Sequence, residues 1–252
     1  MPDTLGLLQL ADACFPSGGF AFSSGLESLA KLGYVKRMED FHQYLDCHLD
    51  QLTSAEIPFL NSAYEAAAPE AFASEAMDER PGTARFPVTG FREVVREWDA
   101  WLFMPAQRRA SLSQGQAWSR AMEEAFDLPA VRAVRSGFSR AGSARQGLPG
   151  QGLALHFLMV FAATLRAAGV SRPDAQSLLL HMSLRDQLGA AVRMGLLGSL
   201  QAQKLHRRFI EVAEEYRRAR KDLDHTLAMR GAHMIDLGQA SHPYLYSKLF
   251  QS

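Results

Sequence analysis

The sequence predicts an all-α fold, in a single helical domain of about ten helices with no significant sheet. Apolar residues recur at spacings of three and four along most of the chain, which is the period of an amphipathic helix. No segment alternates apolar and polar residues with the β-branched content of a strand. The chain has 252 residues, of which 47% are hydrophobic and 21% charged, enough for one sizeable core. We therefore expect residues 1–252 to form one domain.

The first forty residues predict two short helices joined by a turn. Thr4 can cap the first helix, which we expect to face the core with Leu5, Leu7 and Leu8. It should end before the turn-forming residues 16–19, which read Pro-Ser-Gly-Gly. The second helix is expected to begin at Ser23 or Ser24 and to end at Gly33, because glycine readily takes the left-handed conformation that follows a helix.

The next two helices follow from apolar spacing and from one proline. A helix is expected to begin near Met38, with one apolar face formed by Phe41, Leu45, Leu49 and Leu52. Pro58 suits the first turn of the following helix, where its missing N–H costs little. Prolines and glycines then crowd residues 68–90, which predicts a loop or insertion.

The second half of the chain is predicted to be helical on both sides of one linker. Helices are expected over 91–104 and over 105–126, the latter opened by Pro105. Residues 136–152 contain five glycines and a proline, and they predict an internal linker. An apolar helix over 153–168 should follow, either at the centre of the core or in a subunit interface.

The last helices carry small residues and charges. Ser171 and Pro173 should start a helix directly after Gly169. We expect Gly189, Gly195 and Gly198 to permit close helix packing. The final long helix is predicted over 202–227, with an apolar side formed by Leu205, Phe209 and Val212 and a polar side on which Glu214 pairs with Arg218.

Charge and cysteine content exclude several classes of protein. The chain has 27 basic and 27 acidic residues, so it lacks the global positive field of a nonspecific nucleic-acid binder. Residues 1–126 carry 10 basic and 18 acidic residues, and residues 127–252 carry 17 and 9, so the halves can attract each other within one fold or between subunits. Two cysteines, no positive leader and no apolar run of membrane length predict a cytoplasmic protein without a membrane segment.

The sequence predicts no catalytic, cofactor-binding or metal-binding residues. It contains no phosphate-binding glycine loop, nucleophile elbow or zinc-protease motif. His42, Asp46, Cys47 and His48 form the densest group of possible ligands, but they point in different directions around one helix. His156 and His181 are expected in the interior, and His233 and His242 in solvent. The charges of residues 204–221 are expected to form a solvated helix face.

Two segments rich in aromatic residues are predicted to dock on other surfaces. Residues 15–27 place three phenylalanines around a Pro-Ser-Gly-Gly turn, which a solvated turn does not need. The C-terminal tail, residues 241–252, is apolar and aromatic although chain ends usually fray. Arg193 lies in an apolar helix, where a charge is usually paired or at an interface. The predicted partner-binding residues are Pro16, Gly18, Gly19, Phe20, Ser23, Gly25, Glu27, Arg193, Tyr244, Tyr246, Lys248, Leu249 and Phe250.

The chain resembles the urease accessory protein F (UreF) family. The first segment matches that family's PxGGFxxSxGLE pattern at Pro16, Gly18, Gly19, Phe20, Ser23, Gly25, Leu26 and Glu27. The tail resembles its YSRLFRS ending, with Lys248 and Gln251 in place of two arginines, and lysine cannot reproduce a bidentate guanidinium contact. Arg108–Ser111 with Gly115, His156, and residues 190–198 (AAVRMGLLG) match in order and spacing.

This resemblance implies an all-α, dimerising scaffold with no active site and no cofactor. It implies binding to urease accessory protein D, called H in some bacteria, and recruitment or activation of the accessory GTPase G. Nickel would then be passed to apo-urease, to which the chain is linked only indirectly. Two alternatives remain open: a helical enzyme whose pocket is assembled from residues such as His156, Asp186 and Arg193, and a GTPase activator that inserts Arg193.

Overall fold

The predicted all-α fold is confirmed. The computed structural model describes residues 4–67, 89–142 and 154–251, and these ranges contain helices and turns but no β-strand. The N-terminal elements are α1 (Thr4–Ala11), η1 (Gly19–Ala21), α2 (Leu26–Lys31), α3 (Met38–Gln51), the π-helical turn η2 (Leu52–Glu56) and α4 (Ile57–Ala66). They are followed by α6 (Thr89–Trp101), α7 (Pro105–Phe126), α8 (Pro129–Gly142), α9 (Phe157–Ala167), α10 (Arg172–Arg193), α11 (Ser199–Arg220), η3 (His225–Leu227), α12 (His233–Ser241) and η4 (His242–Tyr244).

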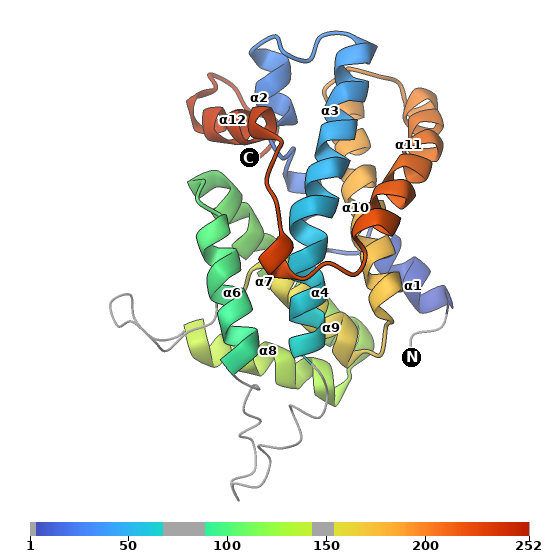
Figure 1. Cartoon of the computed structure of the whole chain (residues 1–252). Coiled ribbons are helices and arrows are strands. Elements are labelled where there is room, and N and C mark those ends of the chain that lie inside the picture. The colour runs from blue at the N-terminus through green and yellow to red at the C-terminus, as the bar shows by residue number, and fades with distance from the viewer. Residues whose placement is uncertain (1–3, 68–88, 143–153, 252) are drawn as a thin grey trace, which may run out of the picture.

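One nearly continuous helical rod runs through the molecule from top to bottom (Figure 1). It consists of α3, η2 and α4, and the π-helical turn η2 joins the two α-helices without a break. The predicted face of Phe41, Leu45, Leu49 and Leu52 is buried, and Pro58 lies in the first turn of α4 as expected. The rod packs against α9 in its lower half and against α11 in its upper half.

Helix α9 is the centre of the core. Every residue from Leu158 to Leu165 is buried, as expected for a helix that is apolar on all sides. Its one buried hydroxyl, on Thr164, accepts a hydrogen bond from the indole N–H of Trp118 at 2.8 Å. Because its sides are covered within the chain, α9 is a core helix and not a subunit interface.

The oppositely charged halves of the chain pair within one molecule. Asp50 on α3 binds Arg220 at the end of α11, with 2.6 Å between the carboxylate and guanidinium groups. Glu65 on α4 binds Arg172 at the start of α10 at 3.3 Å.

The predicted pair of Glu214 and Arg218, both on α11, is present at 3.0 Å. Such partly exposed pairs contribute little stability, about 0–1 kcal/mol each.

Several boundaries differ from the sequence-based prediction. Residues 136–142 were predicted as linker but continue α8, because a helix tolerates one interior glycine at about 1 kcal/mol. The apolar helix begins at Phe157 and not at residue 153, and the last long helix ends at Arg220 and not at 227. Residues 68–88 and 143–153 lie outside the described part of the chain, so most of the predicted insertion and the rest of the linker lie there too.

Two predictions about packing were wrong. In α1 the buried residue is Leu10 and Leu7 packs partly against the core as predicted, whereas Leu5 and Leu8 are exposed, because the helix rests on α10 through a different side. Gly189 and Gly195 do not bring helices together, since a Cβ atom added at either one would meet nothing within 4 Å. Gly195 instead has a positive φ of 73° just after α10, which glycine adopts readily.

Among the described residues, no helix combines the length and the apolar content that a membrane span requires.

Close helix packing occurs at Gly115 of α7. A Cβ atom there would overlap the backbone carbonyl oxygen of Leu155, which leads into α9. We expect Gly115→Ala to lower the free energy of unfolding by about 1–3 kcal/mol through overpacking. Gly189→Ala is the matched control, because alanine in an open helical position stabilises by about 0.5–1 kcal/mol. Denaturant unfolding of both variants checks this, and equal stabilities would contradict it.

Candidate partner-docking site

The N-terminal segment of residues 15–27 is fixed by backbone geometry that favours glycine. Gly18 has a positive φ of 79°, and a Cβ atom on Gly19 would overlap the carboxylate of Asp186. Gly18 therefore suits its position through its backbone conformation, whereas the carboxylate near Gly19 is the end of a side chain that can move. Phe15 is buried against Trp118, with 5.2 Å between ring centroids. The segment is therefore packed on the core and does not extend into solvent.

Helix α12 is held against the start of α2 by two glycines. Gly25 has a φ of 90°, and a Cβ atom on it would lie 2.9 Å from the carbonyl oxygen of Ile235. A Cβ atom on Gly238 would lie 2.8 Å from the carbonyl oxygen of Gly25. The two backbones meet without side chains between them, which brings the C-terminal tail next to the N-terminal segment (Figure 1).

The carboxylate of Glu27 binds the tail from inside the protein. Glu27 is fully buried on α2, and its oxygens accept hydrogen bonds from the backbone N–H groups of Leu249 at 2.7 Å and Phe250 at 3.3 Å. Lys31, one turn later, forms an ion pair with Glu27 at 2.8 Å and also donates to the backbone carbonyl of Ser247. His242 lies 3.2 Å from the other carboxylate oxygen. One acidic side chain thus holds both ends of residues 242–250.

The charges of this cluster are set by burial and by these partners. Burial opposes ionisation of Glu27, but the hydrogen bonds from Lys31, Leu249 and His242 outweigh it and lower the pKa of the carboxyl. Burial also lowers the pKa of His242, although Glu27 acts in the opposite direction. At neutral pH Glu27 is therefore a carboxylate and His242 a neutral imidazole. The prediction that His242 is solvated was wrong, whereas His233 is exposed as expected.

Arg193 joins the two segments from the other side. Its guanidinium carbon lies 3.6 Å from the ring centroid of Phe20 and 4.4 Å from that of Phe250. It also donates a hydrogen bond to the carbonyl oxygen of Phe20 at 2.6 Å. A guanidinium between two aromatic faces is favourable, about 0.5–2 kcal/mol for each ring. The backbone N–H of Gln251 donates to the carbonyl of Ala21 at 2.8 Å, which completes the contact.

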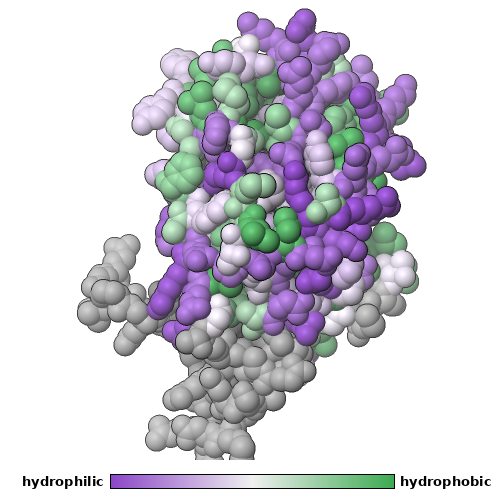
Figure 2. Space-filling model, viewed as in Figure 1, coloured by the Kyte–Doolittle hydropathy of each residue, from purple (hydrophilic) through white to green (hydrophobic). Residues whose placement is uncertain are grey.

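The joined segments present an apolar surface to solvent. We define the docking face as the exposed side chains of Phe20, Tyr244, Tyr246 and Leu249. Leu237 and Met234 of α12 are partly exposed nearby in sequence, and Figure 2 shows hydrophobic side chains at the upper left, over α2 and α12. Large aromatic side chains that remain exposed on an ordered backbone are typical of protein interfaces.

The structure brings together most, but not all, of the predicted site residues. Glu27, Ser23 and Phe250 are buried and support the face, whereas Lys248 is exposed and donates to the carbonyl of Pro243 at 3.0 Å. Pro16 lies apart, in a groove between α1 and α7 that is also lined by Leu5 and Leu8. No local pattern predicts the contact between Lys31 and Ser247 of the tail, because the two residues are 216 positions apart.

The residues of the alternative enzyme pocket do not converge. His156 is buried between Asp99 at 2.6 Å and Ser111 at 3.2 Å, while Asp186 pairs with Arg185. The Ser111, His156 and Asp99 cluster has the residue types of a hydrolase triad. The Ser111 hydroxyl, however, also accepts the backbone N–H of Phe157, and Asp99 pairs with Arg108 at 2.7 Å. These contacts fasten the start of α9 to α6 and α7.

The possible metal ligands of α3 point toward separate partners. His48 bonds to Ser183 at 2.7 Å, Asp46 accepts a hydrogen bond from Tyr216 at 3.1 Å, and His42 packs on Phe209. Within the described ranges, no three His, Cys, Asp or Glu side chains lie close enough together to hold a metal ion.

The helical fold and the exposed aromatic docking face define a helical protein that binds other proteins. Comparison with known proteins identifies its family. The sequence model of the UreF family matches residues 35–210, so the chain belongs to the UreF family. Urease accessory protein F of Arabidopsis thaliana is 26% identical over 245 residues, which cover 97% of this chain and 90% of the relative. Urease accessory protein UreF of Chromohalobacter salexigens is 29% identical over 255 residues, covering 98% and 94%.

Further relatives have the same description. Urease accessory protein UreF of Trichodesmium erythraeum is 24% identical over 251 residues, which cover 98% of this chain and 96% of the relative. The chain is therefore a urease accessory protein with a role in urease maturation, and it is not an enzyme. The resemblance inferred from the motifs is confirmed, and the alternative of an α-helical enzyme is set aside.

Acid should release the tail from Glu27. Both Glu27 and His242 have lowered pKa values in the docked state, from ordinary values of 4.5 and 6.5, so both side chains bind protons more readily when the tail is released. Docking is then strongest above pH 6.5, weakens below it, and is lost as the pH falls through the lowered pKa of Glu27. Backbone ¹⁵N relaxation of residues 244–251 at pH 7 and pH 4 measures this.

The variant Glu27→Gln provides the control for this prediction. It cannot pair with Lys31, so we expect a mobile tail already at pH 7 and little further change on acidification. Glu215→Gln, at an exposed position on α11, should behave as the unaltered chain. A tail that stays rigid at pH 7 in Glu27→Gln would contradict the role of the carboxylate.

Proposed function

We propose that this chain is a scaffold for nickel insertion into apo-urease. It bridges urease accessory protein D, or H, and the accessory GTPase G, which it recruits or regulates. The observation that carries this proposal is the docking face: three large side chains exposed on a tail that Glu27 and Arg193 hold in place, together with the exposed ring of Phe20 beside them. A preformed surface binds with a smaller loss of conformational entropy than a free tail, which favours stable assembly.

The position of Arg193 favours recruitment of the GTPase over its direct activation. An activating arginine has to reach the nucleotide of the partner. The Arg193 guanidinium is instead enclosed by two rings and bonded to a backbone carbonyl. It therefore supports the docking face, and release from both rings would be needed before it could act elsewhere.

Nickel and GTP are assigned to the partners in this proposal. The scaffold acts in the cytoplasm and touches nickel at most through weak, rapidly exchanging contacts, since a protein that passes an ion on should not retain it. Isothermal titration of the isolated chain with nickel, and separately with GTP, should show no stoichiometric submicromolar binding. Such binding to either ligand would contradict this assignment.

The docking face should account for binding of the D or H protein. The double variant Tyr246→Ala and Leu249→Ala is expected to lose at least tenfold in affinity, about 1.4 kcal/mol, with unchanged thermal stability because both side chains are exposed. The matched control is Leu227→Ala with Met229→Ala, which removes exposed apolar groups near η3, away from the face. Co-purification with the D or H protein and with G, together with urease activation in a deletion strain, measures both.

The two variants separate this proposal from general loss of surface hydrophobicity. Equal binding by the unaltered chain and the docking-face variant would overturn it. Equal loss in both variants would show that the face has no special role.

A homodimer is also part of the proposal. Light scattering at micromolar concentration should give twice the mass of 27.9 kDa. A monomeric mass that persists after the D or H protein is added would exclude a dimeric scaffold.

A further inference from the structure

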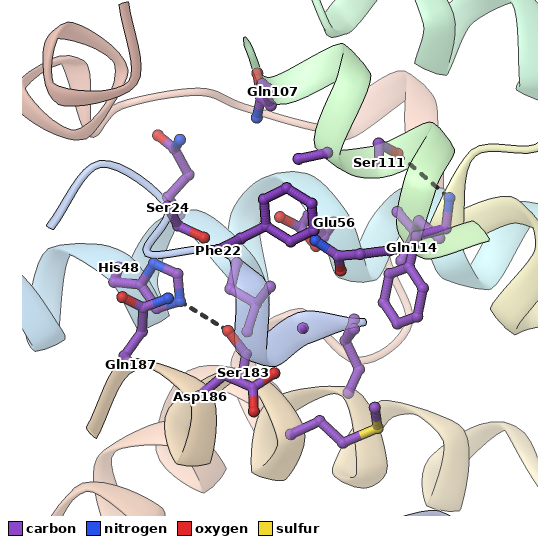
Figure 3. Close-up of a pocket in the computed structure, with 18 of the residues that line it drawn as sticks. Phe22, Ser24, His48, Glu56, Gln107, Ser111, Gln114, Ser183, Asp186 and Gln187 are labelled. Carbon is purple, nitrogen blue, oxygen red and sulfur yellow. Dashed lines mark hydrogen bonds between the residues drawn. The ribbon is translucent and has the colours of Figure 1, made fainter. Parts of the chain in front are cut away.

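A cavity of about 150 Å³, lined by both polar and apolar side chains, lies directly behind the N-terminal segment. Ser17, Gly19 and Phe22 of that segment form part of its wall, and the remaining wall comes from η2, α3, α6, α7, α9, α10 and α12. Figure 3 shows side chains from several of these elements around the space, with Phe22 among them and Glu56 labelled nearby. A cavity of this size has room for several water molecules, which can bond to the polar groups in its wall.

The π-helical turn η2 places an acidic side chain at this cavity. Glu56 is the last residue of η2; it is partly buried and lines the cavity. Among the described residues its carboxyl forms no hydrogen bond or ion pair. Isolated π-turns in helical rods often mark functional positions. A partly buried carboxylate without a partner is costly to ionise, because it loses part of its hydration.

No neighbouring charge compensates Glu56. Arg230 lowers the pKa of the Glu56 carboxyl by less than burial raises it, and its guanidinium is bound by Asp236 of α12 at 2.5 and 2.8 Å. His48 of α3 is kept neutral, since burial lowers the pKa of its imidazole to about 4. Asp186 of α10 adds negative charge and is paired with Arg185. The segments of α6, α7 and α9 that line the cavity contribute no titratable side chain.

The wall also contains an unpaired hydrogen-bond donor. Trp98 of α6 lines the cavity, and its buried indole N–H has no acceptor among the described residues. The indole N–H of Trp98 lacks an acceptor and the carboxyl of Glu56 lacks a partner. Together they suit a neutral molecule that both donates and accepts hydrogen bonds. They do not suit a cation, for which the described residues assemble no ligand group.

We propose that Glu56 is a proton-binding site in the wall of this cavity, held as the neutral acid by water there, and that loss of its proton loosens the N-terminal segment that forms another part of the wall. Burial raises the pKa of Glu56 to about 7. The ionised carboxylate needs more water than the neutral acid, and the wall of residues 17–22 is the part that carries the docking segment. The inference does not depend on which partner the docking face binds.

The sign of the pH dependence distinguishes this proposal from ordinary packing. Because the pKa of Glu56 rises from 4.5 to about 7 on folding, its contribution to stability is present below pH 4.5 and is lost as the pH rises to about 7. We expect Glu56→Gln to melt at a higher temperature than the unaltered chain at pH 8, with the difference shrinking toward pH 5. Glu215→Gln is the control for removal of a carboxylate and should show no such trend.

Two measurements on the unaltered chain test the proposal even if Glu56→Gln fails to fold. Infrared difference spectra between pH 6 and pH 9 should contain the carbonyl band of a protonated carboxyl that Glu215→Gln retains. Hydrogen–deuterium exchange of peptides covering residues 17–24, corrected for the intrinsic effect of pH, should increase between pH 6 and pH 8. Absence of the band, or a constant exchange rate, would overturn the proposal, as would a melting difference that does not change with pH.

Discussion

The buried carboxylate of Glu27 is the constraint on which the docking surface depends. A charge in the interior is tolerated only when partners replace its hydration, and here those partners come from both ends of the chain. Lys31 supplies the opposite charge, while the backbone of Leu249 and Phe250 supplies the hydrogen bonds. The charge therefore requires the tail, and the tail requires the charge. Removing either partner leaves the other unsatisfied in a dry environment, which makes their association cooperative.

Arg193 and the glycines convert this local bond into a surface with a defined shape. The guanidinium lies between Phe20 and Phe250, so one ring from each segment keeps its position relative to the other. Gly25 and Gly238 let α12 approach α2 without side chains between them. The exposed rings of Tyr244 and Phe20 are consequently presented by an ordered backbone. An assembly factor gains from this order, because its surface is specified before the partner arrives.

Local signals in the sequence predicted most of the fold. Pro105 marked the start of α7, Ser171 capped α10 through the N–H of Asp174, and Gly33 has the positive φ expected after α2. The errors arose where tertiary contacts decide. Nothing local distinguishes Leu10 from Leu5 and Leu8, and the inward side of α1 depends on where α10 lies. A glycine-rich composition also concealed the end of α8, because helix propensity is only a weak constraint beside packing.

The segments of the candidate site were predicted from the sequence, but the contacts between them were not. Motifs identified the N-terminal segment, Arg193 and the tail, because aromatic residues at a turn and at a chain end are unusual in sequence. The contact between Glu27 and Phe250 spans 223 positions, and no spacing rule connects residues so far apart. The same applies to Glu56, whose isolation results from the arrangement of helices around it and from the charge of Arg230 being bound by Asp236.

The positions of the two chain ends decide where a tag can be fused to this protein without covering the docking face. In Figure 1 the N-terminus emerges at the lower right, beside α1, whereas the C-terminus lies at the upper left, next to α2 and α12. A purification tag or reporter fused after Ser252 would begin two positions beyond Gln251, whose backbone is bonded to Ala21. Such a fusion would cover the docking face. A fusion at the other end leaves that surface free, so the choice of end decides whether the native assembly can be observed.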